Sequence, residues 1–294
     1  MRALSRFDLL WFVPGALLLA WLERQWPMLA LAFFVLLTLT LGFAHGAMDI
    51  FLLRDARNRL NAKSCFAYAL ACSAFAAVLA PWPSVALIAL LLLSVWHFGE
   101  EAHFEHAGQP VAWLLRAVQG GSSVMLPALL SPRELLPQVQ AIAQDHASWV
   151  WPLWVGMAGL WFALLTAAFA IMKPWRADTA KTLWIELAVL IALNILLSPL
   201  MAFALFFGIY HSGAHILRMR QMHLREGKPW QDGLLAATVV LTWLGLAALL
   251  WWMGDQTFVR QDAALLLRWL VVALAAVTLP HLILIWRSRQ RLFA

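Results

Sequence analysis

Long apolar runs recur along almost the whole chain and leave only short polar segments between them. A helix needs about 20 apolar residues to cross the roughly 30 Å hydrocarbon core of a bilayer. Runs of this kind lie near residues 7–23, 28–47, 65–80, 84–99, 111–130, 149–171, 182–198, 200–217, 233–253 and 264–286. We therefore expect an all-α, polytopic integral membrane helical bundle of about ten transmembrane helices (8–10), with residues 1–294 forming a single membrane domain.

The composition excludes a soluble protein. Hydrophobic residues make up 63% of the chain and charged residues 12%, and the mean hydropathy is +0.77. These values are far from those of soluble domains. The net charge of +6 does not call for a nucleic acid, because basic residues beside anionic lipid are the usual cytoplasmic anchors of membrane helices.

The positions of Lys and Arg predict the orientation, because these residues accumulate on cytoplasmic loops. With ten spans, sixteen of the 21 basic residues fall on one side of the membrane. Arg24, Arg133 and Arg260 fall on the other side. Both termini are therefore predicted to be cytoplasmic, in a multi-pass protein of the inner (plasma) membrane.

Two histidines, His211 and His215, lie four residues apart inside a predicted span. At this spacing both imidazole rings project from one face of a helix. This arrangement offers two nitrogen ligands to a single metal ion. The pair is the strongest local indication of function in the sequence.

The predicted topology places five histidines from four helices near one level of the membrane: His45, His97, His211, His215 and His281. Ionisable residues in a membrane bundle face its interior and mark functional sites. Isolated histidines of this kind can also form hydrogen bonds between helices or contact lipid headgroups. Matched depth and the helical pair favour a metal site, and a set of neutral imidazoles without a thiolate indicates non-haem iron or copper.

Carboxylates follow two of these histidines closely. Asp49 lies four residues after His45, and Glu100 and Glu101 lie three and four residues after His97. Each carboxylate can accept a hydrogen bond from the second ring nitrogen of a ligand, which fixes the tautomer and the ring direction. The alternatives are that Asp49 balances the basic loop after it and that the two glutamates are solvated.

The other four histidines are not expected at this site. His103 and His106 belong to a polar segment that we place at the cytoplasmic surface. His146 lies on the opposite side of the membrane, and His223 lies in a basic cytoplasmic loop.

Four short motifs occur in a fixed order. They are His-Gly-Ala-Met-Asp at 45–49, Trp-His-Phe-Gly-Glu-Glu at 96–101, His-Ser-Gly-Ala-His at 211–215 and Thr-Leu-Pro-His at 278–281. This combination resembles the Brp/Blh family of membrane β-carotene 15,15'-dioxygenases. The resemblance implies an iron enzyme that cleaves β-carotene with O2 into two retinals, which serve a microbial rhodopsin. It also implies that Fe(2+) is bound by His45, His97, His211 and His215, with His281 next to these ligands or in the cavity wall.

Aromatic residues surround the implied ligands in the sequence. We expect them to line an apolar tunnel for a polyene, and ordinary packing in the bundle is the alternative. The residues are Trp96, Phe98, Phe203, Phe206, Phe207 and Tyr210.

Other function classes remain as alternatives. One is a transporter or channel whose intramembrane histidines relay protons or carry a metal, although the polar residues crowd one side of the membrane. Another is a non-haem oxygenase acting on a different lipid. A haem protein would need facing histidines from separate helices, and a di-iron desaturase would need about eight clustered histidines.

Overall fold

The structure is a computed structural model. It describes residues 6–26, 33–34, 36–42, 46–54, 59–100, 111–172, 177–225, 231–253 and 263–293. In these ranges every regular element is helical, and the extended backbone amounts to one isolated bridge between Arg54 and Leu60. The prediction of an all-α fold is therefore confirmed. Of the predicted span 28–47, residues 28–32, 35 and 43–45 lie outside the described residues.

The described ranges contain both α-helices and shorter 3-10 and π-helical segments. They are α1 (Arg6–Gln25), η1 (Thr38–Gly42), α4 (Asp49–Leu52), α5 (Ala62–Leu79), α6 (Pro83–Phe98), α8 (Ala112–Leu130), α9 (Pro132–Ala143), η2 (Gln144–His146), α10 (Ala147–Met172), α11 (Ala177–Leu196), α12 (Pro199–Ala204), η3 (Leu205–His211), α13 (Ser212–Arg225), α14 (Asp232–Met253) and α16 (Ala263–Phe293).

Within the described ranges, four helical stretches are long and apolar enough to cross a membrane. They are Ala62–Leu79, Pro132–Ile171, Pro199–Gln221 and Leu267–Arg287. Three further apolar helices are shorter: Pro83–Phe98, Leu183–Leu196 and Asp232–Leu241. The number of ten spans and the cytoplasmic position of both termini stay predictions.

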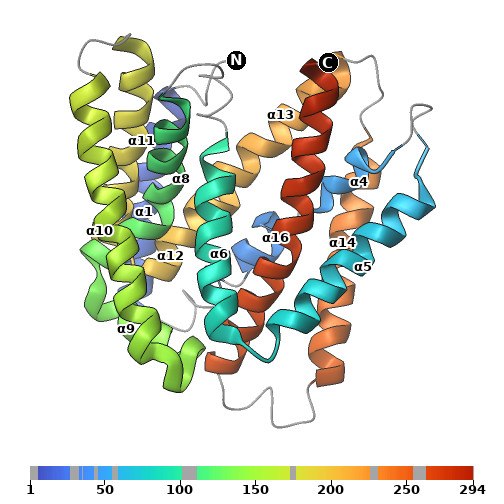
Figure 1. The fold of residues 1–294 in the computed structure, drawn as a ribbon, viewed down its shortest axis with the longest axis horizontal. Coiled ribbons are helices and arrows are strands. Elements are labelled where there is room, and N and C mark those ends of the chain that lie inside the picture. The colour runs from blue at the N-terminus through green and yellow to red at the C-terminus, as the bar shows by residue number, and fades with distance from the viewer. Residues whose placement is uncertain are drawn as a thin grey trace.

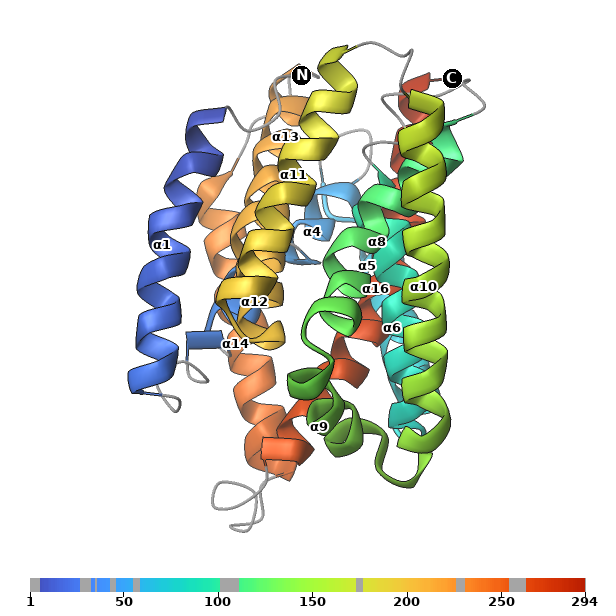
Figure 2. The same ribbon diagram turned by 90° about the vertical axis from the view of Figure 1, so that its left-hand side faces the viewer.

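The bundle is built around α6 and α16. Helix α16 packs against α5, α6 and α9, and α8 packs against α6, α10 and α11. Figure 1 shows α6 and α16 side by side in the middle of the molecule, with α8, α10 and α11 on one side and α5 and α14 on the other. In Figure 2, α1 and α10 lie at opposite edges. Helices α6 and α16, which carry His97 and His281, are therefore inner helices of the bundle.

Glycines allow α6 and α8 to approach each other closely. A Cβ atom added at Gly120 would overlap the carbonyl oxygen of Val95, and one added at Gly99 would overlap the carbonyl oxygen of Arg116. Small residues at helix contacts are a common means of close packing in membranes. The contact holds the end of α6, where His97 lies, against α8.

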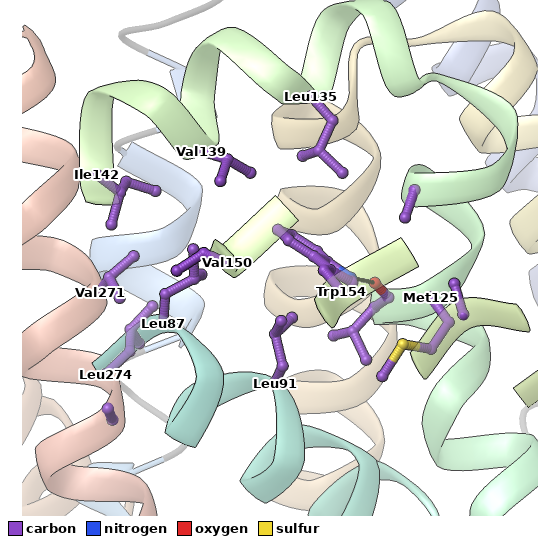
Figure 3. Packing of buried hydrophobic residues seen from close by; sticks show 14 of the residues in the cluster. Leu87, Leu91, Met125, Leu135, Val139, Ile142, Val150, Trp154, Val271 and Leu274 are labelled. Atoms are coloured by element: carbon purple, nitrogen blue, oxygen red, sulfur yellow. Dashed lines mark hydrogen bonds between the residues drawn. The ribbon is translucent and has the colours of Figure 1, made fainter. Parts of the chain in front are cut away.

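The segment between the fifth and sixth predicted spans is not a simple loop. Helix α9 begins with a proline at its first turn and ends before Gln144, whose φ of 52° lies in the left-handed region. Leu135, Val139 and Ile142 are buried on one side of this helix. Figure 3 shows them directed at side chains of α6 and α16. Helix α9 therefore closes one end of the bundle core.

The turn at Ser198 and Pro199 separates α11 from α12. The hydroxyl of Ser198 accepts a hydrogen bond from the Met201 backbone N–H, and Pro199 occupies the first helical position. Both features are typical of helix N-termini. The chain then runs through a π-helical segment, η3, into α13. Such segments often occur at functional sites, and this one ends at His211.

Candidate metal centre and its cavity

Four histidine rings lie next to one another in the interior of the bundle. They belong to α6, η3, α13 and α16, and all are buried: His97, His211, His215 and His281. The ring centroids of His97 and His211 are 4.8 Å apart, and those of His97 and His281 are 4.9 Å apart. His215 lies 5.6 Å from His281 by the same measure. The rings therefore form one contiguous cluster.

The closest approach in the cluster joins two ring nitrogens. The Nε2 atoms of His97 and His211 are 3.1 Å apart. One proton can be shared between them, since a neutral imidazole offers one donor and one acceptor. Two histidine nitrogens that bind one metal ion at about 2.0–2.1 Å also lie about 3 Å apart when they occupy neighbouring positions. The observed spacing fits both situations.

The histidine at the end of the chain is held by a carboxylate. The Nδ1 atom of His281 lies 2.7 Å from Oδ1 of Asp49, and the two side chains are almost fully buried. The other oxygen of Asp49 accepts a hydrogen bond of 2.6 Å from the Tyr68 hydroxyl. A carboxylate that accepts from Nδ1–H leaves Nε2 with its lone pair. Asp49 therefore sets the tautomer of His281.

Glu100 is less directly engaged with its histidine. Its Oε2 atom lies 4.0 Å from Nδ1 of His97, which is too long for a hydrogen bond. Glu100 is nevertheless buried beside this ring. The predicted ligand His45 and the predicted carboxylate Glu101 lie outside the described residues. His103 and His106 are also outside them.

The donor types suit a transition metal, but they do not form a preformed site on their own. Across the described ranges, no three His, Cys, Asp or Glu side chains converge tightly enough to hold a metal ion. His97 and His211 are the two that meet at ligand spacing. A complete site at this place requires further movement of His215 or His281, or another ligand.

A cavity, which we call the histidine cavity, lies beside the cluster. The open space in this cavity and at its mouth amounts to about 1100 Å³. Its polar wall includes Asp49, Tyr68, His97 and His281, whereas most of the other lining residues are apolar. A ligand in this cavity would therefore be mainly apolar and would contact two of the histidines.

The predicted aromatic residues have different surroundings. Phe207 lines the histidine cavity. Its ring stacks on that of Phe203, with centroids 5.5 Å apart, and on that of His211, at 6.3 Å. Phe98 packs edge-on against His211 and against Phe206. Phe98, Phe206 and Phe207 therefore surround one side of the candidate ligand His211, and Phe203 lies behind Phe207.

Two of the predicted tunnel residues are directed elsewhere. The Trp96 ring is 46% exposed and lies 3.6 Å from the guanidinium carbon of Arg116. The Tyr210 hydroxyl donates a hydrogen bond to Glu186, whose other oxygen accepts from Gln119. Neither ring lines the histidine cavity. Trp96 and Tyr210 each come directly before a histidine of the cluster. One step along a helix turns a side chain by about 100°, which directs both rings away from the cavity.

Sequence reasoning did not single out Tyr68. It lies on α5, nineteen residues after Asp49, and no helical spacing links the two. Its only signal is that it is one of two tyrosines in a very apolar chain. Of the histidines excluded from the site, His146 is exposed at the end of η2, directly before α10 begins, and lies beside Trp149. The side chain of His223 lies outside the described part of the chain.

Comparison with known proteins gives the family. The family model described as beta-carotene 15,15'-dioxygenase matches residues 36–287, which is most of the chain. The chain belongs to this family. The beta-carotene 15,15'-dioxygenase of an uncultured marine bacterium, 66A03, is 25% identical over 89% of this chain and 92% of its own length. The predicted resemblance to this family is thus confirmed.

A second relative of the dioxygenase family comes from an archaeon. The probable beta-carotene 15,15'-dioxygenase Blh of Halobacterium salinarum is 28% identical over 58% of this chain and 55% of its own length. No solved structure matches the chain.

Proposed function

We propose that this chain is an integral membrane dioxygenase that splits the central 15,15' double bond of β-carotene, or of a related carotenoid, with O2 to give retinal. Membership of the dioxygenase family supports the reaction. The observation that carries the proposal is the pair of Nε2 atoms of His97 and His211, 3.1 Å apart, with His97 in the wall of a largely apolar cavity. A polyene and a metal-binding group would meet there.

We infer that the cofactor is non-haem iron, Fe(2+), held by His97, His211 and His215 together with His45. The donor chemistry supports this assignment, because neutral imidazoles suit iron and the His97–His211 spacing is that of two neighbouring ligands. When bound, iron would supply the redox chemistry that makes O2 reactive towards an alkene. His281 would stay beside these ligands, oriented by Asp49.

The residues around the cluster have three roles in this proposal. The apolar walls of the histidine cavity exclude water and bind the polyene through apolar contact. Phe207 presents a ring face beside His211, on which a conjugated chain can stack. Asp49 and Tyr68 hold His281 in one tautomer. Together they position a double bond next to the metal-binding nitrogens.

The proposed substrate and product are both lipid-soluble. The long apolar helices support a location in the bilayer, and we propose a multi-pass arrangement of about ten spans in the plasma membrane with both termini cytoplasmic. The carotenoid would enter from the lipid and retinal would return to it. A microbial rhodopsin in the same membrane is a suitable acceptor for retinal.

The test is expression of the full chain in bacteria that accumulate β-carotene, followed by chromatography of pigment and retinal. We expect loss of β-carotene and formation of retinal with the wild-type chain. His97→Ala should abolish the reaction, and His146→Ala, at an exposed histidine outside the cluster, should not. Unchanged β-carotene at normal membrane expression and iron supply would contradict the proposed substrate.

A further inference from the structure

A second cavity, which we call the apolar cavity, adjoins the histidine cavity. The open space in this cavity and at its mouth amounts to about 750 Å³, and its walls are apolar except for Ser94, Ser123 and Gln138. Leu274 lines both cavities. Figure 3 shows part of this region, with Leu87 and Leu91 of α6 facing Leu135 and Val139 of α9 and with Leu274 at one side.

One face of α16 runs along both cavities. The residues on this face recur at intervals of three and four, which is the spacing of a single helical stripe. Those in the apolar cavity are Leu267, Leu270, Val271 and Leu274, and those in the histidine cavity are Leu274, Val277, Thr278 and His281. The apolar cavity is therefore a continuation of the site along the axis of α16.

Two other elements repeat this arrangement. On α6, the lining residues from Leu87 to Ser94 lead to His97 in the next turn. On α12 and η3, Phe203 lines the apolar cavity and stacks on Phe207, which lines the histidine cavity. Each of the elements that carry His97, His211 and His281 thus extends from the cluster into the same apolar space.

The length of this space matches half of a carotenoid. At 1.5 Å per residue, Leu270 lies about 16 Å from His281 along α16, and Leu87 lies about 15 Å from His97 along α6. An extended C40 carotenoid is about as long as the hydrocarbon core of a bilayer is thick, about 30 Å. With its central bond at the histidines, its terminal ring would lie near the α9 end of the apolar cavity.

Gln138 gives that end a polar group. Leu135, Gln138, Val139 and Ile142 all line the cavity from one face of α9. The Oε1 atom of Gln138 is buried and has no hydrogen-bond partner among the described residues. Buried amide groups are normally paired. A ring hydroxyl both donates and accepts, so it can pair with this amide in either of its orientations.

We propose that the apolar cavity holds one terminal ring of the substrate and that Gln138 binds a hydroxyl on this ring, so that Gln138 determines how efficiently a carotenoid with a hydroxylated terminal ring is used relative to β-carotene. This inference rests on the proposed function. In the reaction the central carbon–carbon double bond breaks and each carbon takes one oxygen atom from O2. The ring hydroxyl passes unchanged into one product, giving one retinal and one hydroxylated retinal.

Turnover of two pigments tests the role of Gln138. The kcat/KM values are measured for β-carotene and for β-cryptoxanthin, which carries a hydroxyl on one ring. We expect Gln138→Leu to lower the ratio of β-cryptoxanthin to β-carotene about tenfold, the effect of losing one buried hydrogen bond. Gln140→Leu, on the exposed side of α9, should leave the ratio unchanged. An equal ratio in Gln138→Leu and wild type would overturn the proposal.

A binding measurement separates this inference from the reaction. The full-length protein is purified without O2 in the presence of both pigments, and the bound ratio is measured by chromatography. A bound ratio that depends on Gln138, with neither pigment cleaved after iron and O2 are added, would retain the ring site and reject the reaction. A ratio that changes in Ser123→Ala but not in Gln138→Leu would overturn the assignment, because Ser123 carries the other buried oxygen in this cavity wall without such a partner.

Discussion

Nδ1 of His281 lies 2.7 Å from Oδ1 of Asp49, although 232 positions separate the two residues in the chain. The contact connects α4 with α16 in the interior of the bundle. Because Asp49 also accepts from Tyr68, both of its oxygens have defined partners. The pair therefore fixes the direction of one imidazole at the edge of the histidine cluster.

Replacing Asp49 with Asn should weaken iron binding about 10- to 100-fold, the usual effect of losing a carboxylate that orients a histidine at a metal site. The amide keeps the size of the side chain but loses the charge that favours Nδ1–H as the donor. Iron affinity is measured by titration of the purified protein. Asp145→Asn, at an exposed position, is the control, and equal affinity in the two variants would contradict the assigned role of Asp49.

Tyr68→Phe removes the hydroxyl that donates to Asp49 and keeps the ring. We expect a smaller loss of iron affinity than in Asp49→Asn, since one of the two contacts of the carboxylate remains. If Tyr68 acts through Asp49, adding Tyr68→Phe to the Asp49→Asn variant should cause no further loss. A double-mutant cycle of iron affinities measures this coupling, and additive losses would show that Tyr68 acts independently.

His211→Ala and His215→Ala should each abolish iron binding and activity and leave membrane insertion intact. Both rings are buried in the cluster, and each is a proposed ligand. Metal analysis of the purified variants and quantification of the inserted protein are the measurements. Retained iron together with normal turnover in either variant would remove that histidine from the ligand set.

A tryptophan in the apolar cavity should block long substrates. Leu91 lines this cavity and is 4% exposed, whereas the adjacent Leu92 is 54% exposed. We expect Leu91→Trp to reduce β-carotene cleavage at least tenfold with unchanged iron content, and Leu92→Trp to behave as wild type. Because the block lies beyond the histidines, cleavage of apocarotenoids shortened at one end should persist. Equal losses for both substrates would indicate a general packing defect.

Gly120→Ala should destabilise the contact between α6 and α8 by about 1–3 kcal/mol, the usual range for overpacking. The added Cβ would overlap the carbonyl oxygen of Val95, and backbone cannot move aside as a side chain can. Gly156→Ala on α10 is the matched control, since nothing lies within 4 Å of its added Cβ. Thermal unfolding in detergent measures both. Equal Tm values would show that the two helices separate easily.

Hydropathy predicted those helices whose whole length is apolar. The predicted spans at 65–80, 84–99, 111–130 and 149–171 correspond to α5, α6, α8 and α10. Helix α9 was missed because its twelve residues are too few to cross a bilayer and its polar face resembles a loop. Its buried residues recur at helical spacing, but their partners on α6 and α16 are set by the tertiary fold.

Membrane depth was sufficient to bring together most of the candidate site. The predicted topology placed five histidines at one level of the membrane, and four of them are neighbours in the structure: His97, His211, His215 and His281. The side on which an aromatic residue lies could not be predicted in the same way, because one step along a helix turns a side chain by about 100°. Trp96 is therefore exposed although His97 is buried.

The single stripe of α16 that runs from Leu267 to His281 has a consequence for where the polyene is cut. A rigid helix keeps the part of the apolar cavity that binds the terminal ring at a constant distance from the histidines. The distance from the ring site to the histidines would then determine which double bond is cleaved. A carotenoid with a longer or shorter polyene chain on that side would place an off-centre bond beside the same nitrogens. Cleavage would be symmetric when half the length of the substrate equals the distance along α16 between the ring site and the histidines.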